Sequence, residues 1–493
     1  MTALLLTVLL LPFAHAADST VNVNTTWSGN VTLAGNVTVA SGATLTLSSG
    51  PSVDAKSYSI VVEGTMVVND ASFFSSVVPA TQGSHGQGLW AGVVIESTGA
   101  AVFDNVVVAN ASAGVLVKGA FDGDTVTVND AYRGISVMGG VATLEQFHAN
   151  RIDYEALYVE SGSLTLETGE VNEVAVGLAN HAQANISDLT VREAGVGVQS
   201  QAGSLNLTGL GLINASVGVA TVTGADSTIS SVTGSGLALA IDASNTDGFS
   251  FGQAQLSGHR LMVAQGASSL LLDDVEFTGT STENRAVADI NCDGTCTLVD
   301  TSLESTQYGV ALSGAGTHAL EGLEVSATAQ GLQATGAGHV VLRNASVTAN
   351  DHALSIQTPT SSLSSVNVST TTSQGIGVDV LGGVHVWDDV VMSKPFLSSD
   401  RDSIGLNMWY ADVTVEHLTV RNYSTAAMLE DSMADVATLE ANIGSVAGVH
   451  LIESSYAGQS LTTVAQDEGV VMEGTSSLHL SAWTAQLHDT PLM

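Results

Sequence analysis

Residues 114–117 read Gly-Val-Leu-Val, a small residue followed by a short run of aliphatic side chains. The same pattern recurs at a regular spacing, with a small residue in every case but one and then Val, Ile, Leu or Met. The pattern begins at Gly114, Gly134, Ala156, Gly177, Gly195, Gly218, Gly236, Arg260, Ala286, Gly309, Gly331, Ala353, Gly377, Gly405, Ala427, Gly448 and Gly469. Between these positions lie further short alternating runs bounded by Gly, Asn or Asp, and no stretch carries a helical period.

A repeat of this length holds three short strands, which are too few to close a core, so each unit must stack on the next. The sequence therefore predicts an all-β fold, a right-handed parallel β-helix solenoid of about 20 coils with about 22 residues per coil. Equivalent residues of successive coils would lie about 4.8 Å apart. Tandem sandwich domains of about 100 residues and hexapeptide helices do not fit this spacing.

Asparagines recur four to six residues before successive repeats, at Asn110, Asn129, Asn150 and Asn172, and Asn214 rejoins the series. Asn tolerates the left-handed backbone and hydrogen-bonds readily, so we expect these residues to form a ladder at one corner of the coil. A structural role is favoured for them over ligand binding.

Residues 1–16 predict a secretory signal peptide, because an apolar run ends at Ala14-His-Ala16, a small-x-small cleavage site. No later stretch reaches the roughly 18 uninterrupted apolar residues of a membrane helix. We expect a secreted or cell-surface protein with N-terminal capping and first coils at 17–100 and β-helix repeats at 101–493. The chain stops two residues into a further strand, so we expect the last coil to be truncated.

The chain is acidic, with 48 Asp and Glu, 11 Lys and Arg and a formal net charge of −37. Nucleic-acid binding and docking on anionic lipid are therefore excluded, since both need a basic surface. Hydrophobic residues make up 44% of the chain, which excludes intrinsic disorder.

Four passages near the N-terminus carry a family resemblance. They are residues 27–33 (Trp-Ser-Gly-Asn-Val-Thr-Leu), 42–47 (Gly-Ala-Thr-Leu-Thr-Leu), 60–65 (Ile-Val-Val-Glu-Gly-Thr) and 88–95 (Gly-Leu-Trp-Ala-Gly-Val-Val-Ile). The chain resembles the secreted right-handed parallel β-helix repeat proteins of bacteria and archaea, in the pectin-lyase-like superfamily. The resemblance implies the fold and leaves the function open, because the superfamily holds polysaccharide lyases, hydrolases and epimerases beside many non-catalytic surface proteins.

Enzymes of that superfamily place carboxylates, sometimes with calcium, and a basic residue on one outward face of the coils. The best match here is Asp388 and Asp389, which would lie one coil from Glu416 and His417. Arg401 falls in an insertion that lengthens the intervening coil, between the repeat starts at Gly377 and Gly405. Carboxylates this close can share acid and base roles on a glycosidic bond, so these five residues are catalytic candidates. The alternative is an ordinary solvated acidic rim.

Aromatic residues near the same insertion are candidates for substrate binding, because a flat ring can stack on a pyranose. They are Trp387, Trp409 and Tyr410. Core packing is the favoured alternative for Trp387, at the inward position that Leu272 fills in another coil.

Cys292 and Cys296 are the two cysteines, and in an exported chain they most simply form a small disulfide loop. The same segment matches the calcium-loop template Asp-x-Asn-x-Asp-Gly with an acid at the twelfth position. The ligands of such a site would be Asp289, Asn291, Asp293 and Asp300. The cross-linked turn is the favoured interpretation.

The leading hypothesis is a non-catalytic secreted or cell-surface β-helix protein with an adhesive, scaffold or glycan-contacting role. Its expected partners are extracellular polysaccharide or cell-envelope components, and calcium is the one cofactor that the sequence suggests. The alternative is a polysaccharide lyase or glycoside hydrolase acting on an extracellular polysaccharide.

Overall fold

The computed structural model describes residues 18–77, 89–222, 225–280, 285–305, 307–396 and 402–486, and the backbone of residues 490–492. Throughout this part of the chain the regular secondary structure is β-strand, and the strands pair in parallel as a solenoid of about 20 turns, about 22 residues apart. The predicted fold class is confirmed, and the hand of the coil stays a prediction. The predicted signal peptide lies outside the described residues. No helix in the described residues is long and apolar enough to cross a membrane.

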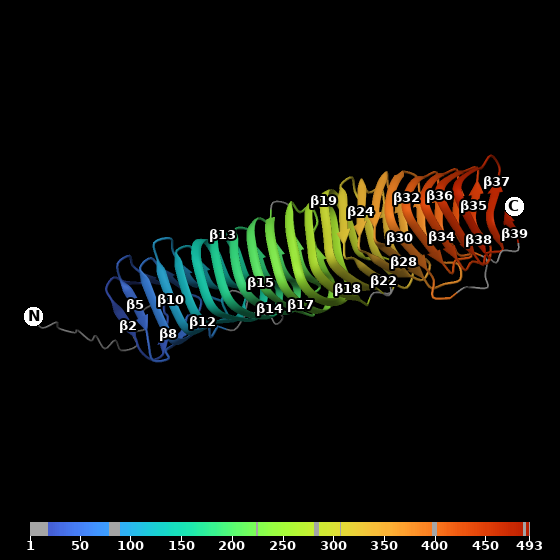
Figure 1. Cartoon of the computed structure of the whole chain (residues 1–493). Coiled ribbons are helices and arrows are strands. Elements are labelled where there is room, and N and C mark those ends of the chain that lie inside the picture. The colour runs from blue at the N-terminus through green and yellow to red at the C-terminus, as the bar shows by residue number, and fades with distance from the viewer. Residues whose placement is uncertain are drawn as a thin grey trace, which may run out of the picture. The chain divides into compact units, whose positions relative to one another are not determined.

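The chain divides into two compact units, Met1–Val219 with Ala225–Ile229, and Ala220–Gly224 with Ser230–Met493. In each unit, short strands follow one another in successive turns (Figure 1). The strands that begin in the first unit before residue 220 are β1 (Ser19–Val21), β2 (Thr25–Trp27), β3 (Val31–Thr32), β4 (Val37–Val39), β5 (Thr44–Leu47), β6 (Ser52–Asp54), β7 (Ser59–Val62), β8 (Thr65–Phe74), β9 (Gly92–Ile95), β10 (Ala100–Ala109), β11 (Ala113–Val117), β12 (Ala120–Ala131), β13 (Arg133–Asn180), β14 (Gln183–Ser200), β15 (Gly203–Ile213) and β16 (Val217–Thr221).

The later strands belong to the second unit, apart from the first residues of β17. They are β17 (Ala225–Asp242), β18 (Gly248–Gly279), β19 (Ala286–Ser305), β20 (Tyr308–Ser313), β21 (Thr317–Glu321), β22 (Glu324–Ala327), β23 (Gln330–Thr335), β24 (His339–Arg343), β25 (Ser346–Ala349), β26 (His352–Gln357), β27 (Thr360–Ser364), β28 (Val366–Thr370), β29 (Ile376–Leu381), β30 (Val384–Ser393), β31 (Ile404–Trp409), β32 (Asp412–Arg421), β33 (Thr425–Glu430), β34 (Met433–Asn442), β35 (Ala447–Ile452), β36 (Ser455–Val464), β37 (Glu468–Glu473), β38 (Ser477–Gln486) and β39 (Thr490–Leu492).

The core is a set of columns in which each inward side chain stacks on its counterpart in the next turn. In the first unit Val106 of β10 pairs with Val126 of β12, which pairs with Phe147 of β13, and all three are buried. Alternate residues of these strands point inward, as the period of two in the sequence predicts. The columns exclude water, and each turn contributes one side chain to each column.

The small residue at the start of each repeat is explained by close packing between turns. A Cβ added at Gly177 would overlap the carbonyl oxygen of Gly197 in the next turn and lie 2.8 Å from Cγ2 of Val191. At Gly331 it would meet Cγ1 of Val347 and the carbonyl oxygen of Ala353. The repeat therefore marks where two layers of backbone come closest.

The predicted asparagine corner is only partly correct. Asn150 and Asn172 form one step of the ladder, since Nδ2 of Asn172 donates to Oδ1 of Asn150 at 3.0 Å. Asn110 and Asn214 take the left-handed backbone with φ of 57° and 56°. At Asn129, Asn150 and Asn172, however, the left-handed residue is the next one along: Asp130, Arg151 and Glu173. The corner requires a left-handed backbone conformation, which Asp, Arg and Glu adopt here as well as Asn. The asparagine pattern therefore predicts the position of the corner only to within one residue.

The second unit contains the lengthened turn that the sequence predicts. The turn from Trp387 of β30 to its ladder partner Val415 of β32 is longer than the next one, from Val415 to its partner Val436 of β34. The extra residues lie between Ser393 and Ile404, where β30 ends and β31 begins. The described strands on both sides of these residues pair with their neighbours in register.

We expect Gly177→Ala to lower the free energy of unfolding by about 1–3 kcal/mol, because the new methyl group overlaps rigid backbone of the next turn. Gly211→Ala is the matched control in the same unit. Its Cβ would meet only the side chain of Thr190, at 3.1 Å, so we expect a cost below about 0.5 kcal/mol. Urea unfolding followed by circular dichroism measures both, and equal costs would contradict the packing explanation.

Candidate functional site

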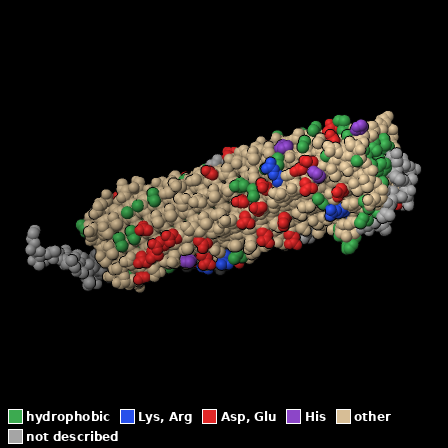
Figure 2. All heavy atoms as spheres, in the orientation of Figure 1, with side chains coloured by type: hydrophobic (Ala, Val, Ile, Leu, Met, Phe, Trp, Pro, Cys, Tyr) green, Lys and Arg blue, Asp and Glu red, His purple; other side chains and the backbone are tan. Residues whose placement is uncertain are grey.

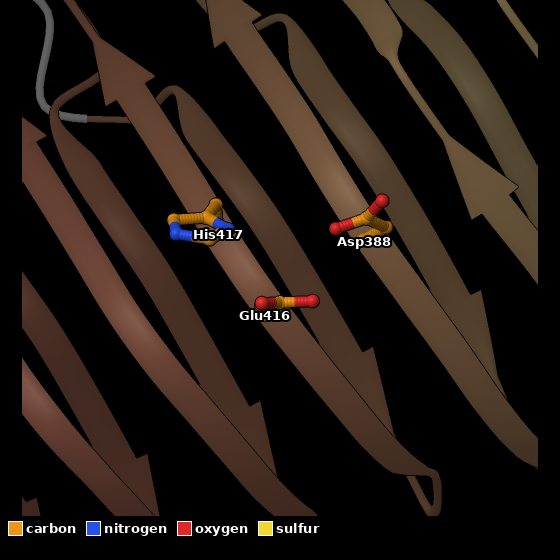
Figure 3. Close-up of side chains that lie close together, drawn as sticks. All are labelled: Asp388, Glu416 and His417. Carbon is orange, nitrogen blue, oxygen red and sulfur yellow. The ribbon is translucent and has the colours of Figure 1, made fainter.

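Two neighbouring turns bring three of the predicted catalytic residues together in the second unit. Asp389 of β30 forms a ladder pair with His417 of β32, which places Asp388 opposite Glu416. One ligand atom from each of Asp388, Glu416 and His417 lies within 4.8 Å of the others, and all three side chains are exposed. Figure 3 shows Asp388 on one strand with Glu416 and His417 on its neighbour.

A corner within each strand turns these side chains outward. Along β30 and β32 buried and exposed residues alternate, except at Asp388-Asp389 and Glu416-His417, where two consecutive side chains are exposed. The following residues, Val390 and Leu418, are buried again. Because the same break falls at the same register in both turns, four polar side chains meet on one outer edge.

The donor set of this cluster is one imidazole and two carboxylates. Imidazole with carboxylates suits a transition-metal ion such as Zn²⁺, whereas Ca²⁺ takes six to eight oxygen ligands. As a catalytic pair, the two carboxylates lie close to the spacing of retaining glycosidases, about 5 Å. Both are exposed to water, however, whereas the general acid of such enzymes typically lies in apolar surroundings. Arg401 lies outside the described residues.

Trp387 is buried in the core, which corrects its prediction as a substrate-binding residue. Its side chain is only 2% exposed, and its Nε1 donates to Oγ of Ser361 at 3.1 Å. Ser361 in turn donates to Nδ1 of His385 at 2.9 Å, because Nε2 of His385 donates to the carbonyl oxygen of Gly382 at 2.7 Å. The tryptophan is therefore one end of a buried polar chain, and the alternative of core packing holds.

Trp409 and Tyr410 are exposed but lie at another corner of the turn. Trp409 ends β31, and Tyr410 occupies the corner before β32 with φ of 53°. From there β32 runs from Asp412 to Glu416, four residues or about 13 Å of strand, before it reaches the carboxylate cluster. These aromatic side chains and the carboxylates do not form one compact constellation.

The two cysteines form the predicted disulfide, and the calcium site predicted in the same segment stays a prediction. Cys292 and Cys296 are bonded to each other and buried within β19. The intended ligands lie along this strand, where Asp289 pairs with Ala311 and Asn291 with Ser313, and Asp300 occupies a left-handed corner. In the described part of the chain the carboxylates of Asp289, Asp293 and Asp300 do not converge on one point. The ladder is irregular at the centre of this segment, between Cys292 and Thr295.

A second site, in the first unit, was missed by the sequence analysis. Tyr132 and Tyr154 occupy neighbouring turns, and their rings stack with centroids 5.6 Å apart and planes 5° apart. The side chains remain 40% and 44% exposed, so the pair presents a continuous aromatic surface to solvent. Tyr158 lies beside it, with its ring edge-on to His181 at 5.5 Å.

Arg133 holds this tyrosine pair in place. Its guanidinium carbon lies 4.4 Å from the ring centre of Tyr158, 5.5 Å from that of Tyr154 and 6.0 Å from that of Tyr132. Its Nε forms an ion pair of 2.7 Å with Oε2 of Glu155, a side chain that is only 7% exposed. Burial raises the pKa of Glu155, and the charge of Arg133 opposes that rise. The arginine is fixed by a buried carboxylate below and by aromatic rings around it.

A sequence signal for this site exists. Tyr132-Arg133 directly precede the repeat start at Gly134, and Tyr154-Glu155 directly precede the next one, at Ala156. Aligning the repeats by those two positions would have stacked tyrosine on tyrosine and arginine on glutamate.

Comparisons with known proteins give no relative. No family model matches the chain, no curated protein matches it, and no solved structure matches it.

We expect the buried His385 to make the protein less stable in mild acid. Burial lowers its pKa, and its Nδ1 accepts a hydrogen bond that protonation would abolish. The unfolded chain takes up the proton first, so stability is complete above pH ~6.5 and falls as the pH drops toward the folded-state pKa. The pKa of His318 is also lowered by burial, so it contributes in the same direction.

Urea unfolding at pH 7.5 and pH 5.0 measures this effect. We expect His385→Gln to reduce the loss of stability between the two pH values, and His318→Gln with His385→Gln to reduce it further. An unchanged loss in the double variant would contradict the assignment, whatever the stability of the variant at pH 7.5.

Proposed function

We propose that the protein is a non-catalytic extracellular β-solenoid that contacts glycans through Tyr132 and Tyr154 in its first unit. The observation that carries the proposal is the stacked and exposed tyrosine pair. Aromatic side chains offer a large contact area at a low cost in side-chain entropy, and sugar rings present C–H faces that pack against them. The predicted signal peptide supports an extracellular location.

The fixed arginine supports a binding role over a purely structural one. An exposed arginine–aromatic contact contributes about 0.5–1 kcal/mol, which a solenoid with a continuous core does not need at one surface point. Arg133 and Glu155 instead hold two tyrosines in a single orientation while leaving both partly exposed. Such rigidity reduces the entropy that a ligand must remove on binding.

A glycan array followed by calorimetry on its strongest ligands tests the proposal. We expect Tyr132→Ala with Tyr154→Ala to weaken binding at least tenfold, about 1.4 kcal/mol, because the whole aromatic surface is removed. The matched control is Tyr410→Ala, which removes an exposed tyrosine from the second unit. We expect it to leave the affinity unchanged.

Three outcomes would contradict the proposal. The first is that no glycan binds. The second is that Tyr410→Ala loses affinity and the double variant does not, and the third is that the unsubstituted protein, the double variant and Tyr410→Ala bind with equal affinity. Circular dichroism of each variant shows whether its strands remain folded, so a loss of binding through unfolding is recognised.

A second candidate function, a polysaccharide lyase or hydrolase, is favoured by the approach of Asp388 to Glu416 within 4.8 Å beside His417. The exposure of Asp388, Glu416 and His417 to solvent favours the non-catalytic function. Incubation with neutral and acidic polysaccharides, followed by assays for reducing ends and unsaturated uronates, separates the two functions. We expect no turnover. Turnover that disappears in the triple variant Asp388→Asn, Asp389→Asn and His417→Ala would establish the enzyme instead.

A further inference from the structure

One extra residue lengthens the corner of the turn beside the tyrosine pair. Ala131 pairs with Ile152, and Gly134 lies against the carbonyl oxygen of Ala156. Two residues lie between Ala131 and Gly134, whereas three lie between Ile152 and Ala156. The turn that carries Tyr154 therefore has one more residue at this corner. Tyr154 matches Tyr132 and Glu155 matches Arg133 by contact, which leaves Asp153 as the extra residue.

The carboxylate of Asp153 has an unused acceptor. Its Oδ2 is buried and has no hydrogen-bond partner in the structure. A buried acceptor without a donor costs roughly 1–3 kcal/mol, so such atoms are rare in native proteins and point to a partner. An inserted residue next to an exposed aromatic surface is a common means of aiming one side chain at a ligand.

Two arginines beside the tyrosine pair are each matched by an acid, and the negative charge of Glu160 also acts on Tyr158. Arg133 is paired with Glu155, and Arg151 is held by both carboxylate oxygens of Asp130 at 2.6 Å. Acidic side chains gather on the face shown in Figure 2, where basic ones are few. With Asp153 and Glu160 nearby, a ligand at the tyrosine pair therefore meets a net negative charge.

We propose that Asp153 selects the sugar that binds the tyrosine pair, favouring amino sugars with a free ammonium group, accepting neutral sugars and rejecting uronates. This inference rests on the proposed glycan-binding function. An ammonium group donates charge-assisted hydrogen bonds to the carboxylate, a hydroxyl group donates ordinary ones, and a uronate carboxylate is repelled. The C–H faces of the β-1,4-linked glucosamine and glucose oligomers fit the tyrosines equally, so those two ligands differ only in the ammonium group.

Calorimetry with three oligosaccharides of equal length tests the inference: a glucosamine oligomer, a neutral cello-oligosaccharide and an oligogalacturonate. We expect the glucosamine oligomer to bind about tenfold more tightly than the neutral one, and the oligogalacturonate not to bind. We expect Asp153→Asn to remove the tenfold preference while holding affinity for the neutral oligomer within about threefold. Asp188→Asn, an exposed acid of the same unit, is the control and should preserve the preference.

The outcomes separate the two proposals. If none of the three oligomers binds, the inference falls, and the glycan array decides whether the proposed function falls with it. If the neutral oligomer binds through Tyr132 and Tyr154 but the preference is absent, reversed or insensitive to Asp153→Asn, the inference alone is overturned.

Salt provides a measurement that needs no variant. Raising NaCl from 0.05 M to 1 M shortens the Debye length from more than 10 Å to about 3 Å. We therefore expect the affinity for the glucosamine oligomer to fall to that of the neutral oligomer, whose own affinity stays constant. A preference that persists in 1 M salt would overturn the role of the Asp153 charge even if Asp153→Asn does not fold.

Discussion

Parallel stacking in register is the constraint on which this structure depends. Each residue lies about 4.8 Å from its counterpart in the next turn, so a side chain is surrounded mainly by residues that the sequence places one repeat away. Where the counterparts are apolar, as at Val106 and Val126, a core column forms. Where both are tyrosine, as at Tyr132 and Tyr154, the rings stack. The repeat therefore determines which side chains are neighbours on the surface of the molecule as well as in its interior.

The same constraint makes like charges costly. Asp124 of β12 stands opposite Glu145 of β13, between the ladder pairs on either side of them, and the charges of Asp124, Glu167 and Asp122 all contribute to raising the pKa of Glu145. Salt weakens such repulsion between exposed groups. Arg133 and Glu155 also occupy equivalent positions of successive turns, but their charges have opposite signs. The same stacking therefore produces an ion pair there. Electrostatic attraction thus depends on which residue falls one repeat later.

Most of the fold could be predicted from the sequence because it follows from local and periodic properties. The regular spacing, the inward alternation and the lengthened turn after Trp387 need only residue types and counting. The disulfide between Cys292 and Cys296 follows from proximity in the chain. The calcium template in the same segment stays a prediction, because a short motif cannot reveal that Asp289 and Asn291 belong to a paired strand.

The candidate sites were less predictable because they depend on register to within one residue. The carboxylate cluster was found, since Asp388 and Glu416 each begin a polar pair at one position of the repeat. The inward direction of Trp387 agrees with the favoured prediction of core packing, whereas its prediction as a substrate-binding residue needed a register one position away, which reverses the direction of the side chain. The asparagine corner was displaced by one position for the same reason.

The tyrosine pair shows why departures from the repeat carry the strongest functional information. A perfect solenoid would treat all its turns alike, and a site needs one place that differs. Turns of the first unit differ in length at several places, and one such difference, Asp153, is added where Tyr132 and Tyr154 already offer a flat surface. The insertion leaves the core columns in register on both sides, so it costs little in packing. Its main consequence is a carboxylate oxygen without a partner, and a ligand is the component that would satisfy it.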